Sequence, residues 1–285
     1  EIEAYAKKQD PSFMLYGEGW NMGGEVQTPL GHMDNAKLLP DFAFFNDRFR
    51  EGVKRFVSMD YSALDLFKFA LISSSMEFGG NKALFLNANQ SLNYVECHDN
   101  ATFFDYVSSS RPSLPLEEKL DLCKMGMAIT LLSYGIPFIH AGQEIAQSKF
   151  GKDNTYNLPD VYNRFSYRLL DERQEMADYF RSLVAFRKAR RFLHDYDVRL
   201  LGPMVELSDE NGVVIEKIAD GNEMAPYKEL TFFFNPGDQN LSHEFKVDHE
   251  IILGTSGVAE GANLSVSSLL LPKHSVTGVC LKAQK

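Results

Sequence analysis

The 285-residue sequence has few cysteines, no long apolar run and a deficit of positive charge, and each of these excludes some classes of protein. Its three cysteines, Cys97, Cys123 and Cys280, have no framework spacing and indicate reduced core thiols. No apolar run approaches the roughly 20 residues of a membrane span, and residues 1–10 lack a basic-then-apolar signal segment. A formal net charge of -10 disfavours nucleic acid and anionic membranes as partners. We therefore expect a neutral or polar ligand instead of an anionic one.

Several chemical motifs are also missing. The sequence has no Gly-x-Ser-x-Gly elbow, no phosphate-binding P-loop, no Cys-x-x-Cys and no His-Glu-x-x-His. Its glycines do not form a dinucleotide fingerprint, and its seven histidines are dispersed. We therefore expect neither a cofactor nor a metal site.

The first two thirds of the chain alternate short apolar runs with helical patterns, which is typical of βα units and a parallel sheet. Strands are predicted at 13–16, 42–45, 92–97 and 136–139, and helices at about 46–57, 117–133 and 173–191. Four such units make half of an eight-unit (β/α)8 barrel, but an open doubly wound sheet gives the same alternation. The pattern by itself leaves both folds open.

The sequence pattern changes near residue 195, from alternating strand and helix signals to strand signals alone. Apolar runs at 213–215, 230–234, 245–247, 251–253 and 278–281 are separated by turn signals, as in an antiparallel sandwich. We therefore predict two domains, an α/β domain over residues 1–194 and an all-β sandwich domain over residues 195–285.

Glu18 is a candidate general acid. It follows the first predicted strand between two glycines, beside Trp20, the only tryptophan of the sequence. An apolar neighbour raises the pKa of a carboxyl group, as general-acid work at neutral pH requires. An indole also stacks well on a sugar ring. The alternative is a solvated loop glutamate beside a tryptophan that anchors the core.

Further polar candidates follow the third and fourth predicted strands. His98, Asp99 and Asn100 offer a donor, an acceptor and an amide that suit sugar hydroxyls, or else they cap the next helix. The long loop after the fourth strand carries Asp153, Tyr156, Asn157 and Asn163, and a plain surface loop is the alternative. If these residues follow successive strands of one sheet, they converge on one cleft with Glu18.

Four segments together resemble the type I pullulanase group of the α-amylase superfamily. They are Tyr16-Gly17-Glu18-Gly19-Trp20, Phe44-Phe45-Asn46-Asp47-Arg48, Tyr94-Val95-Glu96-Cys97-His98-Asp99-Asn100, and Gly142-Gln143-Glu144 with the stretch from Asp153 to Asp160. They are similar, in order, to the segments at strands five, six, seven and eight of that family's barrel. Two departures are Asn21, where an Asp is common, and Tyr167, near a position usually held by Trp.

The resemblance implies the C-terminal half of a (β/α)8 TIM barrel followed by a β-sandwich. It implies hydrolysis, with retention, of α-1,6 linkages in pullulan and in branched starch or glycogen fragments. Glu18 would protonate the leaving oxygen and then activate water, while His98 and Asp99 hold the distorted sugar ring. The partner would be an α-glucan.

The family's nucleophilic Asp precedes the segment that Glu18 occupies. We therefore expect the isolated chain to be inactive and to self-associate through exposed barrel edges. An α-glucan transglycosylase of the branching type and a non-catalytic α-glucan-binding fragment are the alternatives, and the strand-eight segment argues against the first. Reduced cysteines favour a bacterial cytoplasm over secretion.

Overall fold

We analysed a computed structural model, which describes residues 2–24, 29–193, 204–219, 227–260 and 264–282. The predicted boundary between residues 194 and 195 lies outside these ranges. Among the described residues, no helix has both the length and the apolar character needed to cross a membrane.

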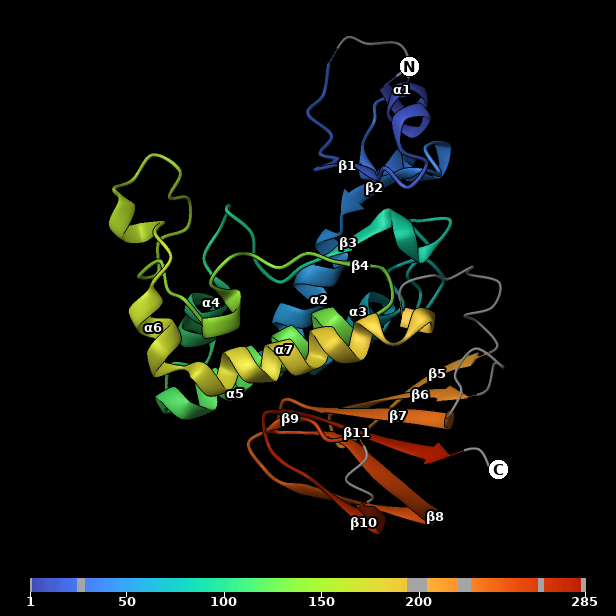
Figure 1. Cartoon of the computed structure of the whole chain (residues 1–285), viewed down its shortest axis with the longest axis vertical. Helices are drawn as coiled ribbons and strands as arrows, with labels where there is room; N and C mark the ends of the chain where they lie inside the picture. Colours follow the sequence, from blue (N-terminus) through green and yellow to red (C-terminus); the bar gives the residue numbers. More distant parts are fainter. Residues whose placement is uncertain (1, 25–28, 194–203, 220–226, 261–263, 283–285) are drawn as a thin grey trace.

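The first part of the chain is an α/β unit (Figure 1). Its strands are β1 (Leu15–Gly17), β2 (Phe42–Phe45), β3 (Ser91–Asn93) and β4 (Ile136–Pro137), which pair in parallel in that order. Its helices are α1 (Ile2–Gln9), α2 (Asp47–Val57), α3 (Leu64–Leu71), α4 (Phe103–Ser110), α5 (Leu116–Leu132), α6 (Tyr167–Glu172) and α7 (Gln174–Lys188). A parallel sheet with helical connections was the predicted arrangement, and it is present.

The predicted strand at 42–45 coincides with β2, and the three others are shorter than predicted. The predicted strand at 92–97 ends at Asn93, although Tyr94 and Val95 stay buried. The strand at 136–139 ends at Pro137, whose nitrogen has no hydrogen to donate. One further bond, from the Phe138 amide to the Asn93 carbonyl at 2.8 Å, continues the contact between the two strands. Burial and apolar character therefore extend beyond the hydrogen-bonded ladder.

Asn46 fixes the start of α2, as its position in the sequence predicted. Its side-chain oxygen accepts a hydrogen bond from the Phe49 amide at 3.2 Å. Its side-chain nitrogen donates to the hydroxyls of Ser74 at 3.1 Å and Ser91 at 2.9 Å. The same fully buried residue thus caps the helix that leaves β2 and ties it to the start of β3.

In the last part of the chain, the described residues form one antiparallel sheet of seven strands. The strands are β5 (Val205–Glu210), β6 (Val213–Ala219), β7 (Tyr227–Asn235), β8 (Leu241–Gly254), β9 (Gly257–Val258), β10 (Ser265–Leu271) and β11 (Ser275–Lys282). They pair in the order β10-β8-β11-β7-β6-β5, with β9 on β8. The runs predicted separately at 245–247 and 251–253 both belong to β8. An irregularity in its pairing with β10 and an exposed stretch around Val247 hide that continuity from the sequence pattern.

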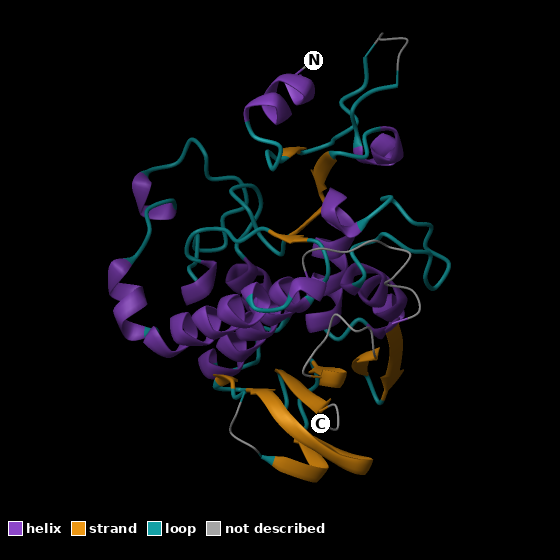
Figure 2. Cartoon of the chain, turned by 45° about the vertical axis from the view of Figure 1, so that its right-hand side comes forward, coloured by secondary structure: helices purple, strands orange, loops and turns teal. Residues whose placement is uncertain are grey.

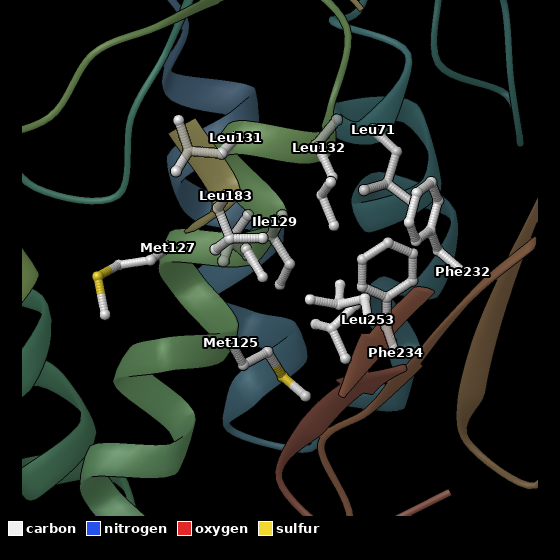
Figure 3. Close-up of a cluster of buried hydrophobic side chains, with 14 of the residues drawn as sticks. Leu71, Met125, Met127, Ile129, Leu131, Leu132, Leu183, Phe232, Phe234 and Leu253 are labelled. Carbon is white, nitrogen blue, oxygen red and sulfur yellow. The ribbon is translucent and has the colours of Figure 1, made fainter. Parts of the chain in front are cut away.

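Helices α5 and α7 lie between the parallel strands and the antiparallel sheet (Figures 1 and 2). One face of the sheet contributes Phe232, Phe234 and Leu253 to a core that it shares with Ile129 of α5 and Leu183 of α7 (Figure 3). The other face curls over a second, smaller core built from side chains of β6, β7, β10 and β11. One apolar interior therefore joins the two parts of the molecule.

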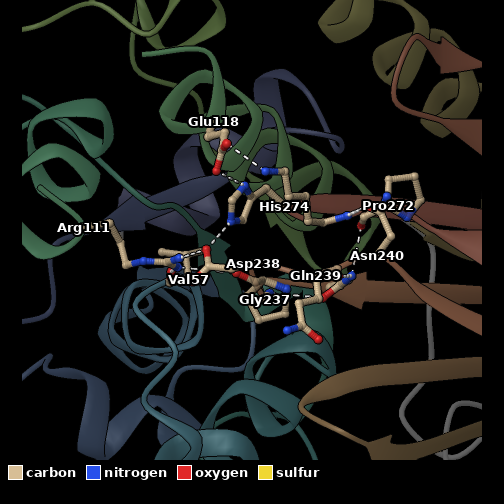
Figure 4. A network of polar contacts seen from close by, with 12 residues as sticks. Val57, Arg111, Glu118, Gly237, Asp238, Gln239, Asn240, Pro272 and His274 are labelled. Carbon is tan, nitrogen blue, oxygen red and sulfur yellow. Dashed lines mark hydrogen bonds and ion pairs between the residues drawn. The ribbon is translucent and has the colours of Figure 1, made fainter. Parts of the chain in front are cut away.

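A polar network also joins the two parts (Figure 4). The buried ring of His274 lies between the carboxylates of Asp238, at 2.9 Å, and Glu118, at 3.5 Å. Arg111 pairs with Asp238, and Lys273 pairs with Glu118 at 2.7 Å. Partial burial acts to raise the pKa of Asp238, but the hydrogen bond of His274 and the charge of Arg111 together lower it. The network fastens the turns of the sheet to α4 and α5.

Glu216 on β6 is a buried acid with no counter-charge among the described residues. Its side chain is fully buried, opposite Leu207 and Phe232 in the two strand pairs. Neither carboxylate oxygen has a hydrogen-bond partner among the described residues. Burial raises the pKa of Glu216 from 4.5 to about 8, so the native chain holds this carboxyl in its neutral form at pH 7.

Replacing Glu216 with Gln should make stability less dependent on pH. The native state keeps a proton that the unfolded chain releases above about pH 4.5, so wild-type stability falls as the pH rises from about 5 to 8. Near pH 8 the Glu216→Gln variant should be more stable than wild type by on the order of a few kcal/mol. Urea unfolding at several pH values measures this. Glu206→Gln, at an exposed site on β5, is the control, and an equal pH slope for wild type and Glu216→Gln would contradict the assignment.

Candidate active site

Side chains that follow β1, β3 and β4 meet at one edge of the parallel sheet. This is expected because the carboxyl ends of parallel strands lie on the same side. They line a cavity of about 340 Å³. Its predicted members are Glu18, Trp20, His98, Asp99, Asn100 and Asp153. Six of the nine residues that the sequence singled out therefore share one cavity.

The two predicted catalytic carboxyls lie close together in this cavity. One carboxylate oxygen of Glu18, one of Asp99 and one ring nitrogen of His98 all lie within 4.8 Å of one another. His98 Nε2 is 3.4 Å from Asp99 Oδ1. These atoms could also hold a cation, but all three side chains reach solvent and no second feature of the described residues points to a metal. Two carboxyl groups and an imidazole that face one small cavity suit proton transfer to a polar ligand.

The turn after β1 requires its glycine. Gly19 has a φ of 72°, and a Cβ at this position would lie 2.5 Å from the buried ring of Phe44. The turn places Glu18 and Trp20 on the cavity wall. Trp20 is 39% exposed, so it does not anchor the core. Its indole is open to a ligand.

The loop that carries His98 and Asn100 is held from two sides. Asn100 has a φ of 62°, a left-handed conformation that Asn tolerates. Arg50 of α2 donates to the side-chain oxygen of Asn100 at 3.3 Å and to the Tyr94 hydroxyl at 2.9 Å. The buried Lys149 donates to the backbone carbonyls of His98 at 2.6 Å and Asn100 at 3.2 Å. Lys149 therefore fixes the backbone of the loop, and Arg50 fixes the side chain of Asn100.

The alternative that these residues cap the next helix is wrong. The N-cap of α4 is Thr102, whose hydroxyl accepts from the Asp105 amide at 3.2 Å. His98, Asp99 and Asn100 lie before that cap and line the cavity.

The loop after β4 places its predicted residues differently. Asp153 lines the cavity and accepts from the Ala101 amide at 3.0 Å. Asn163 lines a neighbouring cavity of about 220 Å³ together with His98, and its side chain bonds Thr155 at 2.6 and 2.8 Å. Tyr156, which is 79% exposed, and Asn157 line neither of these two cavities. The loop thus meets the cavity at Asp153 and its neighbour Asn154.

Five residues of the cavity wall were not among the predicted site residues: Phe45, Arg50, Tyr94, Cys97 and Asn154. All of them except Arg50 lie in the segments that carry the resemblance. Burial raises the pKa of Tyr94, whose hydroxyl donates to Asp47 at 2.5 Å, and burial also raises the pKa of Cys97. Arg50 lies in the first turns of α2, directly after β2. A position just past a strand end was the available signal, since such positions meet at one edge of the sheet.

Comparisons with known proteins find similarity mainly to pullulanases. No family model matches the chain. A pullulanase of Bacillus subtilis (strain 168) is 34% identical over 201 residues, which is 65% of this chain and 27% of that protein. The chloroplastic pullulanase 1 of Arabidopsis thaliana is 41% identical over 81 residues, 27% of this chain and 8% of that protein.

Solved structures agree with the sequence matches. The crystal structure of the Paenibacillus barengoltzii pullulanase in complex with maltohexaose and α-cyclodextrin has a TM-score of 0.89 and 28% identity, covering 99% of this chain and 45% of that one. The type I pullulanase of Bacillus subtilis complexed with maltose gives a TM-score of 0.90 at 24% identity, covering 99% and 41%, and supports the fold.

The chain spans only part of these proteins, about a quarter of the first curated relative and less than half of each solved chain. The resemblance predicted from the sequence, to the C-terminal portion of pullulanases, is confirmed.

Proposed function

We propose that this chain, which resembles the C-terminal portion of pullulanases, is part of a glycosidase that cleaves α-1,6 linkages in pullulan and in branched starch or glycogen fragments. On this proposal residues 1–194 form strands five to eight of a (β/α)8 barrel, and residues 195–285 form the C-terminal β-sandwich domain. The sequential order of the four parallel strands and the curl of the antiparallel sheet support this.

One observation supports the proposed chemistry. A carboxylate oxygen of Glu18, a carboxylate oxygen of Asp99 and a ring nitrogen of His98 lie within 4.8 Å of one another in one cavity. Glu18 protonates the glycosidic oxygen of the leaving group and later takes a proton from the attacking water. Asp99 and His98 hold the hydroxyls of the distorted ring, and Trp20 stacks on the sugar. The charge of Asp99 also stabilises the oxocarbenium-like transition state.

The proposed mechanism needs a second carboxylate as nucleophile, about 5 to 5.5 Å from the acid. In the pullulanase group that Asp precedes the segment that Glu18 occupies, so on this proposal neither Glu18 nor Asp99 is the nucleophile, and the isolated 285-residue chain is expected to be inactive. The short separation of Glu18 and Asp99 would also allow Asp99 to act as nucleophile. Activity of the isolated chain distinguishes the two assignments, because only the second predicts any.

The proposed substrate is a neutral α-glucan. The cavity combines an exposed indole with carboxylate, imidazole and amide groups, which suits the apolar face and the hydroxyls of a sugar ring. The relatives with bound maltose and maltohexaose support the same class of ligand.

Pullulan hydrolysis by a longer protein that contains this chain tests the acid assignment. Glu18→Gln keeps the shape of the side chain but removes its proton transfer, so the rate should fall about 10²- to 10⁴-fold. Glu77→Gln, at an exposed site, is the matched control and should leave the rate unchanged. Intact activity in Glu18→Gln would remove the acid assignment. Glucan binding without hydrolysis would favour the non-catalytic alternative, and transfer products would favour the branching type.

The isolated chain should also self-associate. Strands β1 and β4 end the parallel sheet, and each has one edge without a partner strand among the described residues. Phe13 and Met14, which precede β1, and Tyr16 within β1 are 45 to 52% exposed. An apolar strand edge of this kind is prone to pairing. Light scattering at micromolar concentration should show dimers or larger species, and Tyr16→Lys should reduce them. A monodisperse wild-type monomer would contradict this.

A further inference from the structure

Glu96 is a buried acid that lies two residues before His98 in the chain. It is 3% exposed, and it lines neither the active-site cavity nor the cavity of about 220 Å³ beside it. None of the proposed catalytic steps uses it. Burying a carboxyl group is costly unless polar partners satisfy it. The partners of Glu96 therefore indicate what this side chain does.

One carboxylate oxygen of Glu96 closes the loop that carries His98 and Asp99. Oε2 accepts a hydrogen bond from the amide of Phe103, the first residue of α4. The loop, residues 97–102, is thus joined at its neck, where the chain leaves the interior and returns to it. The first turn of a helix leaves backbone N–H groups without a partner inside the helix, and a negative charge is favourable there.

The other carboxylate oxygen joins the loop to the end of the neighbouring strand. Oε1 lies 3.0 Å from Nδ1 of His140, which follows β4. An ionised carboxyl group can only accept hydrogen bonds, so this contact assigns a proton to Nδ1 of the imidazole. A hydrogen bond at one ring nitrogen also orients the ring. Glu96 thus ties the loop after β3 to the segment after β4.

A second buried acid, Asp105 in the first turn of α4, makes a parallel connection. Its two oxygens accept from the Ser148 hydroxyl at 2.6 Å and from the Lys149 amide at 2.7 Å. The ammonium group of Lys149 in turn donates to the backbone carbonyls of the two residues on either side of Asp99. The backbone around Asp99 is therefore held from the same helix and the same segment that Glu96 joins.

Asp99 depends on these anchors because its own side chain is weakly held. Among the described residues, its carboxylate forms no hydrogen bond or ion pair except the 3.4 Å contact with His98. The position of the carboxylate therefore follows the position of the loop. A displacement of about 1 Å at a reacting group can cost a rate about a hundredfold, so anchors of that loop matter for the chemistry.

We propose that Glu96 is a positioning residue for the reaction at the candidate active site, with His140 as its partner. Glu96 closes the loop at its neck and, through His140, fixes it against the end of β4. This sets where the carboxylate of Asp99 lies relative to Glu18. The inference rests on the proposed function, in which Asp99 holds the sugar ring, and it adds the groups that keep Asp99 in place.

A double-mutant cycle on the 285-residue chain tests this inference, with the affinity for maltotriose measured by calorimetry. Glu96→Gln keeps the shape of the side chain but turns one acceptor into a donor. It should weaken binding about tenfold in the wild-type background and less than about twofold in the Asp99→Asn background, because both changes act on the same group. Glu117→Gln, at an exposed site in the first turn of α5, is the matched control and should leave the affinity unchanged.

Two variants of His140 separate its hydrogen bond from the packing of its ring. His140→Asn places an amide N–H close to the position of Nδ1, so it should bind maltotriose within about twofold of wild type. His140→Phe keeps a ring that cannot donate, so it should weaken binding as Glu96→Gln does. Long-range ¹H–¹⁵N spectra, at a pH where the ring is neutral, should place the His140 proton on Nδ1 in wild type and on Nε2 in Glu96→Gln.

The outcomes separate this inference from the proposed function. If Glu96→Gln folds and weakens binding equally in both backgrounds, or in neither, Glu96 does not act through Asp99 and the inference is overturned, while the proposed function stands. If the wild-type chain binds no maltotriose, the proposed function fails and the inference fails with it. Should circular dichroism show that Glu96→Gln does not fold, the pair of His140 variants decides, and equal affinities in that pair overturn the inference.

Discussion

The shared apolar interior between the helices and the antiparallel sheet is the interaction on which the rest of the structure depends. The parallel strands are only two to four residues long, and such short strands hold few hydrogen bonds of their own. Ile129 of α5 and Leu183 of α7 pack against Phe232 and Phe234 of the sheet, so the helices that follow the strands are fixed from outside. The β-rich part thus serves as the support of the α/β part.

The site is built on this support by a few buried polar groups. Asn46 joins β2, α2 and β3, and Lys149 and Arg50 hold the loop that carries His98. Each of these side chains donates to backbone or side-chain acceptors at partly or fully buried contacts, where a lost hydrogen bond is costly. The reactive groups themselves stay exposed at the rim. Rigid backbone and accessible side chains are the combination that an active site for a polymeric ligand requires.

Local signals in the sequence predicted much of the fold. Strand β2 and the cap at Asn46 were found because a buried apolar run and a capping side chain are both local features. Strand β8 was divided in two because its middle is exposed and irregularly paired, which sequence periodicity does not reveal. The meeting of Glu18 with Asp99 followed from strand order alone. The parts played by Arg50 and Lys149 depend on contacts about 50 residues away in the chain, which no local pattern encodes.

The fluorescence of Trp20 during titration with maltotriose tests the central claim most directly, because the only tryptophan of the chain lines the same cavity as Glu18 and Asp99. Cellotriose, with β-linkages, serves as the control sugar. The account predicts a saturable change in emission with maltotriose, none with cellotriose, and a weakened response in Asp99→Asn. An emission spectrum that maltotriose leaves unchanged, or an identical response to both sugars and in the variant, would contradict it.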